Sequence, residues 1–131
     1  MRLELRLPAR STSLAELRAA LMAWLAGIGV RSGVAFDVVA AASEAASNAI
    51  EHAETPTDPV VEVNAERLDD TLVIRVRDFG RWRAPSFDSD RNRGLMLIQS
   101  LMTHVAVDRM PSGTVVTMRR DLEDALEDAL K

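Results

Sequence analysis

The sequence predicts an α+β fold in which helices cover one face of a mixed, mostly antiparallel sheet. Segments that alternate polar and apolar residues come in adjacent pairs joined by short turns, which is typical of antiparallel strands. The expected order is strand, two helices, two strands, a long irregular segment, helix and two strands, and such elements pack as a two-layer sandwich. Because the chain has 131 residues, we expect a single domain over 1–131, with its core over about 2–119.

The first strand and the first helix follow from local patterns. Residues Arg2–Leu7 carry leucine at every second position, which predicts a half-buried strand. Ser13 is a good helix N-cap, and Glu16 three residues later completes a capping box. We therefore expect a helix from about Leu14 to Ala26, ended by Gly27.

The second helix is expected from about Val34 to Ala53. Its apolar residues, many of them alanine, fall in one arc of about 140° at helical spacing, so one face packs closely against another layer. A turn follows at 54–59, marked by two prolines. Val60–Ala65 and Leu72–Asp78 then alternate as two strands of a hairpin.

The last third of the chain begins with an irregular segment. Residues 79–93 show no periodicity, and loops of that length are often functional lids. A short helix is expected over Gly94–Met102, followed by a hairpin of Val105–Arg109 and Thr114–Arg119. The acidic tail 120–131, with leucines four residues apart from Asp121 onward, predicts an amphipathic helix.

Composition excludes several classes of protein. The chain has no cysteine and only two histidines, which excludes disulfides, thiol catalysis and a multi-histidine metal centre. The net charge of −4 argues against direct nucleic-acid binding. No apolar run reaches the length of a transmembrane helix and the N-terminus lacks a signal-peptide core, so we expect a cytoplasmic protein without a membrane partner.

The basic residues restrict how phosphate could be bound. The only lysine is Lys131, the last residue, and all other basic residues are arginine. A Walker-type phosphate loop and a eukaryotic-type protein kinase both require a lysine within their motifs, so both are excluded. Any phosphate binding must use backbone N–H groups, arginine or a metal ion.

Glu44 and Asn48 are the strongest candidate pair because residues four apart meet on one face of a helix. An amide oxygen is a hard ligand that suits Mg²⁺, and a nearby carboxylate could accept a proton from an attacking hydroxyl. The same two residues also fit a solvated polar face, which periodicity alone favours. His52, on the edge of that face, fits a histidine that complements the C-terminal end of the helix dipole.

Asp78 and Gly80 stand where a strand runs into the irregular segment. A carboxylate there could accept a hydrogen bond from an adenine amino group, and a glycine would let the base approach the backbone. An ordinary strand exit with a turn-forming aspartate explains the pair equally well. Thr114, after Gly113, serves the last hairpin first and any phosphate contact second.

Gly94 is expected to open a helix, and helix N-termini bind phosphate through free N–H groups. Arg91 and Arg93 flank it and could neutralise phosphate charge. The alternative is a solvated basic lid in which these arginines pair with Asp88 and Asp90.

Taken together, the motifs resemble those of the GHKL ATPase superfamily, which has the Bergerat nucleotide-binding fold (the histidine-kinase-like ATPase fold), and within it the bacterial anti-sigma-factor serine kinases. The resemblance covers nearly the whole chain. Four segments match the family's N, G1, G2 and G3 boxes respectively: Glu44-x-x-x-Asn48-Ala-x-x-His52, Asp78-Phe-Gly80, Arg93-Gly94-Leu95 and Gly113-Thr114-Val.

The resemblance implies a role for each matching residue. Asn48 would coordinate Mg²⁺, Glu44 would act on the attacking hydroxyl, and Asp78 with Gly80 would bind adenine. Gly94 and Leu95 would present N–H groups to the phosphates of ATP, and Thr114 would lie near the adenine or the α-phosphate.

The implied function is that of an anti-sigma factor which phosphorylates a serine of an anti-anti-sigma (STAS-type) partner and acts as a homodimer. The alternative is a non-catalytic binding module that sequesters a partner with little or no nucleotide binding. Trp82 and Asn92 favour the alternative, since both replace glycines that the family usually carries. The chain is also compatible with a regulatory domain of a longer protein.

Overall fold

The computed structural model describes residues 1–54, 59–82 and 89–122. Within these ranges the helices are α1 (Ser13–Gly27), α2 (Ser32–His52) and α3 (Ser89–Leu101). The strands are β1 (Arg2–Pro8), β2 (Ala53–Glu54), β3 (Val60–Leu68), β4 (Thr71–Arg77), β5 (Arg81–Trp82), β6 (His104–Met110) and β7 (Gly113–Asp121).

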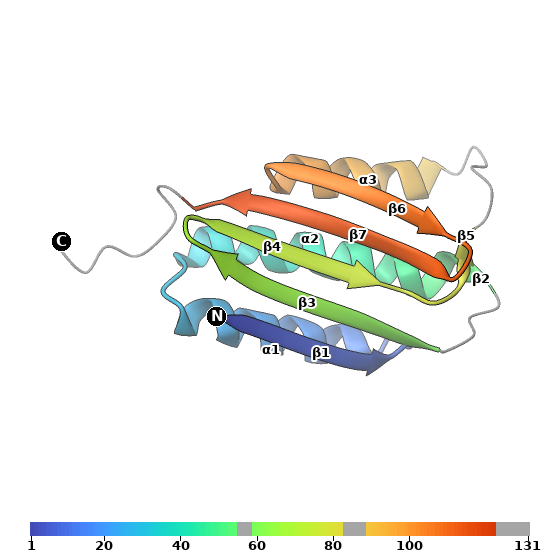
Figure 1. Ribbon diagram of the computed structural model, residues 1–131, viewed down its shortest axis with the longest axis horizontal. Helices are drawn as coiled ribbons and strands as arrows, with labels where there is room; N and C mark the ends of the chain where they lie inside the picture. Colours follow the sequence, from blue (N-terminus) through green and yellow to red (C-terminus); the bar gives the residue numbers. More distant parts are fainter. Residues whose placement is uncertain (55–58, 83–88, 123–131) are drawn as a thin grey trace.

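Five of the strands form one open antiparallel sheet in the order β1-β3-β4-β7-β6. In Figure 1 all three helices lie behind this sheet, with α1 behind β1 and β3, α2 behind the central strands and α3 behind β6. The predicted α+β fold with helices on one face is therefore confirmed. All the pairings in the described part of the sheet are antiparallel.

The register gives the sheet one apolar and one charged face. One row across the strands, facing the helices, holds only apolar side chains: Leu5, Val63, Val76, Val116 and Val107. The neighbouring row, one residue along each strand, points away from the helices and is mostly polar: Glu4, Asn64, Arg75, Thr117 and Ala106. Because side chains alternate between faces, this pattern fixes the register of every strand.

The core lies between the sheet and the helices, with α2 at its centre. The apolar arc of α2 is buried and consists largely of alanine: Ala35, Ala41, Ala42, Ala45, Ala46 and Ala49. Small side chains let α2 lie close to β4 and to both neighbouring helices. On α1, Leu17, Leu21 and Leu25 are almost fully buried, and each contributes about 2–3 kcal/mol relative to an exposed leucine.

Apart from small shifts of element ends, such as β3 reaching Leu68, the structure differs from the sequence predictions in four places. Helix α3 begins at Ser89, five residues before the predicted start at Gly94. Thr12, not Ser13, occupies the N-cap position of α1, without a side-chain capping bond. Strand β7 continues to Asp121, and Leu122 is fully buried in the core instead of starting a tail helix. The rest of the predicted tail helix lies outside the described residues.

The fourth difference is a small second sheet that the sequence did not reveal. β2 directly follows α2, and β5 follows the loop after β4; the two pair antiparallel, with Ala53 opposite Trp82 and Glu54 opposite Arg81. This short ladder joins the end of α2 to the segment after Asp78. No helix among the described residues is long and apolar enough to cross a membrane.

Candidate functional site

The polar face of α2 is covered rather than solvated at its centre. Asn48 is only 8% exposed, and Glu44, one turn earlier, is half-buried. Glu51, on the same face toward the end of the helix, is exposed. A buried amide side chain is unusual unless it has a partner or a ligand to bind, so the solvated-face interpretation fails for Asn48.

The residue that covers Glu44 and Asn48 is Gly94 of α3. A Cβ atom added to Gly94 would lie 2.5 Å from Glu44 Oε1, 3.0 Å from Asn48 Nδ2 and 3.2 Å from Asn48 Oδ1. A side chain at this position would displace the ends of these two side chains from where they now lie. We call Glu44, Asn48 and Gly94 the helix half of the site.

The prediction that Gly94 opens a helix is wrong. Because α3 starts at Ser89, Gly94 is its sixth residue, and the backbone N–H groups of Gly94 and Leu95 lie inside the helix. Only the first four N–H groups of a helix lack a helical acceptor, and these belong to residues 89–92. Arg91 and Arg93 lie in the first turns of α3; the arrangement of their side chains lies outside what the structure describes.

The second part of the site is built at the ends of two neighbouring strands. Asp78, one residue after β4, is 4% exposed, and its Oδ1 atom accepts hydrogen bonds from the backbone N–H of Gly80 (3.1 Å) and of Thr114 (3.3 Å). Asp78 also donates its own N–H to the carbonyl oxygen of Thr114 (3.0 Å). The carboxylate is therefore held in one orientation by the backbone of two segments 36 residues apart in sequence.

Gly113 makes this arrangement possible. It has a φ of 144°, and an added Cβ would overlap the carbonyl oxygen of Asp78, 2.9 Å from its carbonyl carbon and 3.0 Å from the Cα of Phe79. We call Asp78, Gly80, Gly113 and Thr114 the strand half of the site. The sequence patterns place Gly113 in the hairpin turn and in the G3 box but assign it no role in the site; its position directly before Thr114 was the available signal.

Phe79 shows how sharply the two faces of the sheet are separated here. Its ring is stacked by the guanidinium groups of Arg77 (4.6 Å to the ring centroid) and Arg6 (5.8 Å). Arg6 belongs to the charged face of the sheet, where it pairs with Glu62. The chain at 78–79 thus directs a buried carboxylate to one side and a cation-stacked ring to the other.

The structure brings together most of the residues singled out from the sequence. The side chains of Glu44 and Asn48 both lie against Gly94, and Asp78, Gly80 and Thr114 form a second contact set. The β2–β5 ladder joins the helix that carries Asn48 to the loop that follows Asp78. Side chains of His52, Trp82, Arg91 and Arg93 lie outside what the structure describes.

The donor set fits a magnesium nucleotide. Asn48 and Glu44 offer hard oxygen atoms of the kind that Mg²⁺ prefers. The buried and oriented Asp78 carboxylate offers an acceptor for an exocyclic amino group, and a site of that kind discriminates between bases. The described residues contain no cluster of three or more His, Cys, Asp or Glu side chains that could hold a metal without further ligands. A metal here would therefore depend on phosphate oxygens and water as well.

Comparison with known proteins agrees with this geometry. Residues 7–120 match the histidine kinase-like ATPase domain family. The serine-protein kinase RsbW of Staphylococcus aureus is 29% identical over 135 aligned positions, which cover 86% of this chain and 82% of that protein. RsbW of S. aureus strain JH9 is also 29% identical, over 90% of this chain and 85% of the relative.

Solved structures share the fold. A crystal structure of the RsbU and RsbW domains of a Mycobacterium tuberculosis protein superposes with a TM-score of 0.78 and 28% identity over 93% of this chain. The match covers 32% of that longer chain, so this chain spans about a third of it. The blue-light-activated histidine kinase of Erythrobacter litoralis shares the fold at a TM-score of 0.61 and 23% identity, over 88% of this chain and 42% of that one.

Proposed function

The chain belongs to the histidine kinase-like ATPase family, and from this premise we propose that it is an ATP-dependent protein serine kinase that also acts as an anti-sigma factor. The names of the S. aureus relatives, serine-protein kinase RsbW, support the kinase activity. The geometry of the helix half and the strand half supports the residue roles.

In this proposal the strand half binds adenine. Asp78 accepts a hydrogen bond from the adenine amino group, and the N–H groups of Gly80 and Thr114 hold its carboxylate in the orientation required. Gly80 is buried beside it and Thr114 is 2% exposed, so both can line a closed pocket. A guanine base would present a carbonyl oxygen in place of the amino group and would be rejected.

The helix half takes the phosphate end of the nucleotide. Asn48 supplies an oxygen ligand to Mg²⁺, which neutralises phosphate charge when it is bound together with ATP. Arg91 and Arg93 lie in the first turns of α3, and we assign phosphate contacts to them; Gly94 and Leu95 lie farther along α3, where their amides are inside the helix. The free N–H groups at the start of α3, residues 89–92, are a better anion-binding element than the amides of Gly94 and Leu95.

Glu44 is the proposed general base. The Glu44 carboxylate and the Asn48 amide lie close together, because both approach Gly94. The carboxylate accepts the proton of the partner's serine hydroxyl as the serine oxygen bonds to the γ-phosphorus and the bond between that phosphorus and the bridging oxygen of ADP breaks. Positioning and charge neutralisation supply most of the catalysis in such transfers.

The observation that carries the proposal is that the buried Asn48 and the half-buried Glu44 lie together against a glycine of another helix. The experiment incubates the protein with radiolabelled ATP, Mg²⁺ and a STAS-type anti-anti-sigma protein from the same organism. We expect label on the partner, lost with Glu44→Ala and Asn48→Ala but retained with Glu51→Ala, an exposed glutamate of the same helix. Equal labelling by wild type and Glu44→Ala would contradict the role of Glu44.

The partners follow from the same proposal. The protein binds a sigma factor, acts as a homodimer, and releases or recaptures the sigma factor according to the phosphorylation of the anti-anti-sigma partner. A phosphate adds negative charge and weakens a docking surface that lacks matching cations. Co-purification of the two partners in the presence and absence of ATP tests this exchange.

A second candidate is a non-catalytic module that sequesters its partner. The close cover of Gly94 over Asn48 favours it, because this contact fills the space beside the amide. Calorimetric titration with Mg-ADP separates the two candidates. Heat of binding that disappears in Asn48→Ala or Asp78→Ala would exclude the non-catalytic module.

A further inference from the structure

We propose that Arg120 is a positioning residue for the nucleotide site. It fixes the C-terminal end of α3 against α2, and through α3 it sets how closely Gly94 approaches Glu44 and Asn48. The inference rests on the proposed nucleotide-binding function, but its central claim concerns the placement of α3 and can be tested without any nucleotide.

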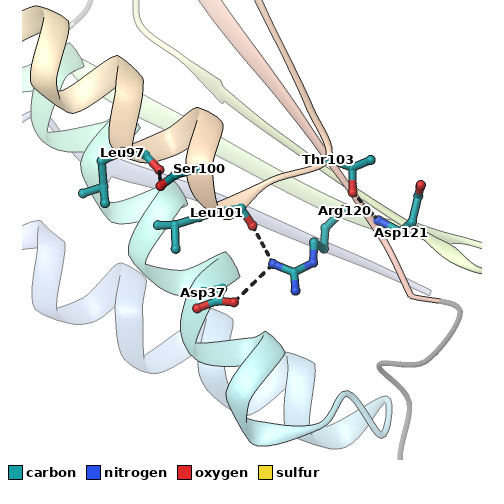
Figure 2. Close-up of polar contacts among 7 residues, drawn as sticks. All are labelled: Asp37, Leu97, Ser100, Leu101, Thr103, Arg120 and Asp121. Atoms are coloured by element: carbon teal, nitrogen blue, oxygen red, sulfur yellow. Dashed lines mark hydrogen bonds and ion pairs between the residues drawn. The ribbon is translucent and has the colours of Figure 1, made fainter.

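The contacts of Arg120 join three elements of the fold. Its Nη1 atom donates to Asp37 Oδ2 of α2 at 3.2 Å and to the carbonyl oxygen of Leu101, the last residue of α3, at 2.5 Å. Figure 2 shows the guanidinium of Arg120 reaching from β7 between the two helices. One nitrogen therefore bridges the N-terminal part of α2 and the C-terminal end of α3.

Helix α3 needs this contact more than an ordinary helix does. The last carbonyl groups of a helix lack a helical partner and carry partial negative charge. The last turn of α3 contains no basic residue that could complement that charge. Arg120, from a neighbouring strand, supplies both the hydrogen-bond donor and the positive charge.

The residues on either side of Arg120 bind the short connection between α3 and β6. The carbonyl oxygen of Arg119 accepts a hydrogen bond from the N–H of Thr103 at 2.7 Å. The N–H of Asp121 donates to Oγ1 of Thr103 at 2.9 Å (Figure 2). Three successive residues of β7 thus hydrogen-bond to Leu101 or Thr103, which fixes the C-terminal end of α3 to the sheet.

The other end of the described helix meets the site. Gly94 precedes Leu101 by seven residues, which corresponds to about 10 Å along a helix. A tilt of about 10° at the anchored end would move Gly94 by about 2 Å on that length. An added Cβ at Gly94 would lie only 3.0 Å from Asn48 Nδ2, so a displacement of about 2 Å decides whether Gly94 and the Asn48 amide touch. The anchor at Arg120 therefore controls the spacing within the helix half.

The first experiment uses two substitutions that differ only in charge and donors. Arg120→Met keeps an unbranched apolar stem and loses both bonds, while Arg120→Lys keeps a single charged nitrogen that can bridge the same two acceptors. For a fluorescent ADP analogue with Mg²⁺, we expect Arg120→Met to raise Kd by roughly 3- to 10-fold and Arg120→Lys to stay within about 2-fold. A lowered melting temperature with unchanged Kd in Arg120→Met would overturn the proposal, because it would indicate a purely structural role.

The second experiment measures the placement of α3 directly. Because the chain has no cysteine, Ala23→Cys on α1 and Met96→Cys on α3, both exposed, accept spin labels without other changes. We expect Arg120→Met to shift or broaden the distance distribution between the labels, and Arg120→Lys to restore it. An unchanged distribution in Arg120→Met overturns the proposal whether or not nucleotide binds. A shifted distribution in a protein that binds no nucleotide supports the positioning of α3 and contradicts the proposed function instead.

Discussion

The two halves of the candidate site are held together by different forces. In the strand half, a carboxylate is fixed by backbone N–H groups, and Gly113 brings two segments so close that no side chain fits between them. In the helix half, two side chains of α2 meet α3 at a glycine, and the contact is made by the ends of flexible side chains. The strand half is therefore rigid, whereas the helix half can change its spacing at low cost. The function proposed above, base recognition followed by phosphoryl transfer, would use both properties.

The largest expected effect is on the free energy of unfolding and comes from Gly113→Ala, which would disrupt the close backbone contact of the strand half. Its Cβ would overlap the backbone of Asp78 and would sit at a φ of 144°, so we expect a loss of roughly 3–5 kcal/mol in the free energy of unfolding. Urea denaturation followed by circular dichroism measures it.

Gly29→Ala is the matched control for that prediction. Gly29 also has a positive φ, 81°, but an added Cβ would meet nothing within 4 Å. It should cost only about 1–2 kcal/mol. Equal losses in the two variants would show that backbone overlap at Gly113 is not what holds the strand half.

Asp78→Asn is expected to have the next largest effect. The amide can still accept from Gly80 and Thr114, but bonds to a neutral acceptor are weaker, so stability should fall by about 1–2 kcal/mol. Preference for ATP over GTP should also fall by roughly tenfold or more, because the new side chain can donate to a guanine carbonyl. Competition binding with the two nucleotides measures the preference, and an unchanged ratio would remove Asp78 from base recognition.

Gly94→Ala tests the opposite property, the adaptability of the helix half. The added Cβ would meet the Glu44 carboxylate and the Asn48 amide, which can rotate away, and alanine is favoured over glycine within a helix. We expect the free energy of unfolding to change by less than about 1 kcal/mol, while Mg-ADP affinity falls roughly 3- to 10-fold. A loss of stability as large as that of Gly113→Ala would mean that the two halves are equally rigid.

The smallest effect is expected from Arg2→Ala on the charged face of the sheet. Arg2 pairs with Glu4 at 3.5 Å and Glu66 at 3.8 Å, but its side chain is 62% exposed. Exposed pairs of this kind contribute little, so the change in stability should stay within about 0.5 kcal/mol and nucleotide binding should not change. A larger effect on binding, measured by the same titration, would extend the site to the other face of the sheet.

The fold could be predicted because each element is encoded locally. Alternation of apolar residues identified the five strands of the main sheet, and the alanine-rich arc identified α2. The start of α3 could not be predicted, because the segment before Gly94 is polar and has no apolar periodicity to mark a helix. The β2–β5 ladder was missed because each strand has only two residues, and a pair of that length has no detectable period.

The site was predicted in part for a similar reason. Asn48 and Asp78 stand in short motifs with a defined spacing, so the resemblance to the GHKL superfamily singled them out. Gly113 and the contact of Gly94 with Glu44 depend on distances between segments far apart in sequence, and a single sequence does not contain those distances. Arg120 was missed because it is one of fifteen arginines and belongs to no motif, and its partners Asp37 and Leu101 lie far from it in sequence.

The two-residue ladder between β2 and β5 has a consequence for how the protein fluctuates. The ladder ties the C-terminal end of α2, the helix that carries Asn48, to the segment that follows Asp78. A ligand that slows local unfolding of one of these segments therefore also slows local unfolding of the other. Amide protons of Ala53 and Trp82 should therefore exchange with deuterium as one cooperative unit. A ligand bound to the strand half alone would then slow hydrogen exchange at the C-terminal end of α2.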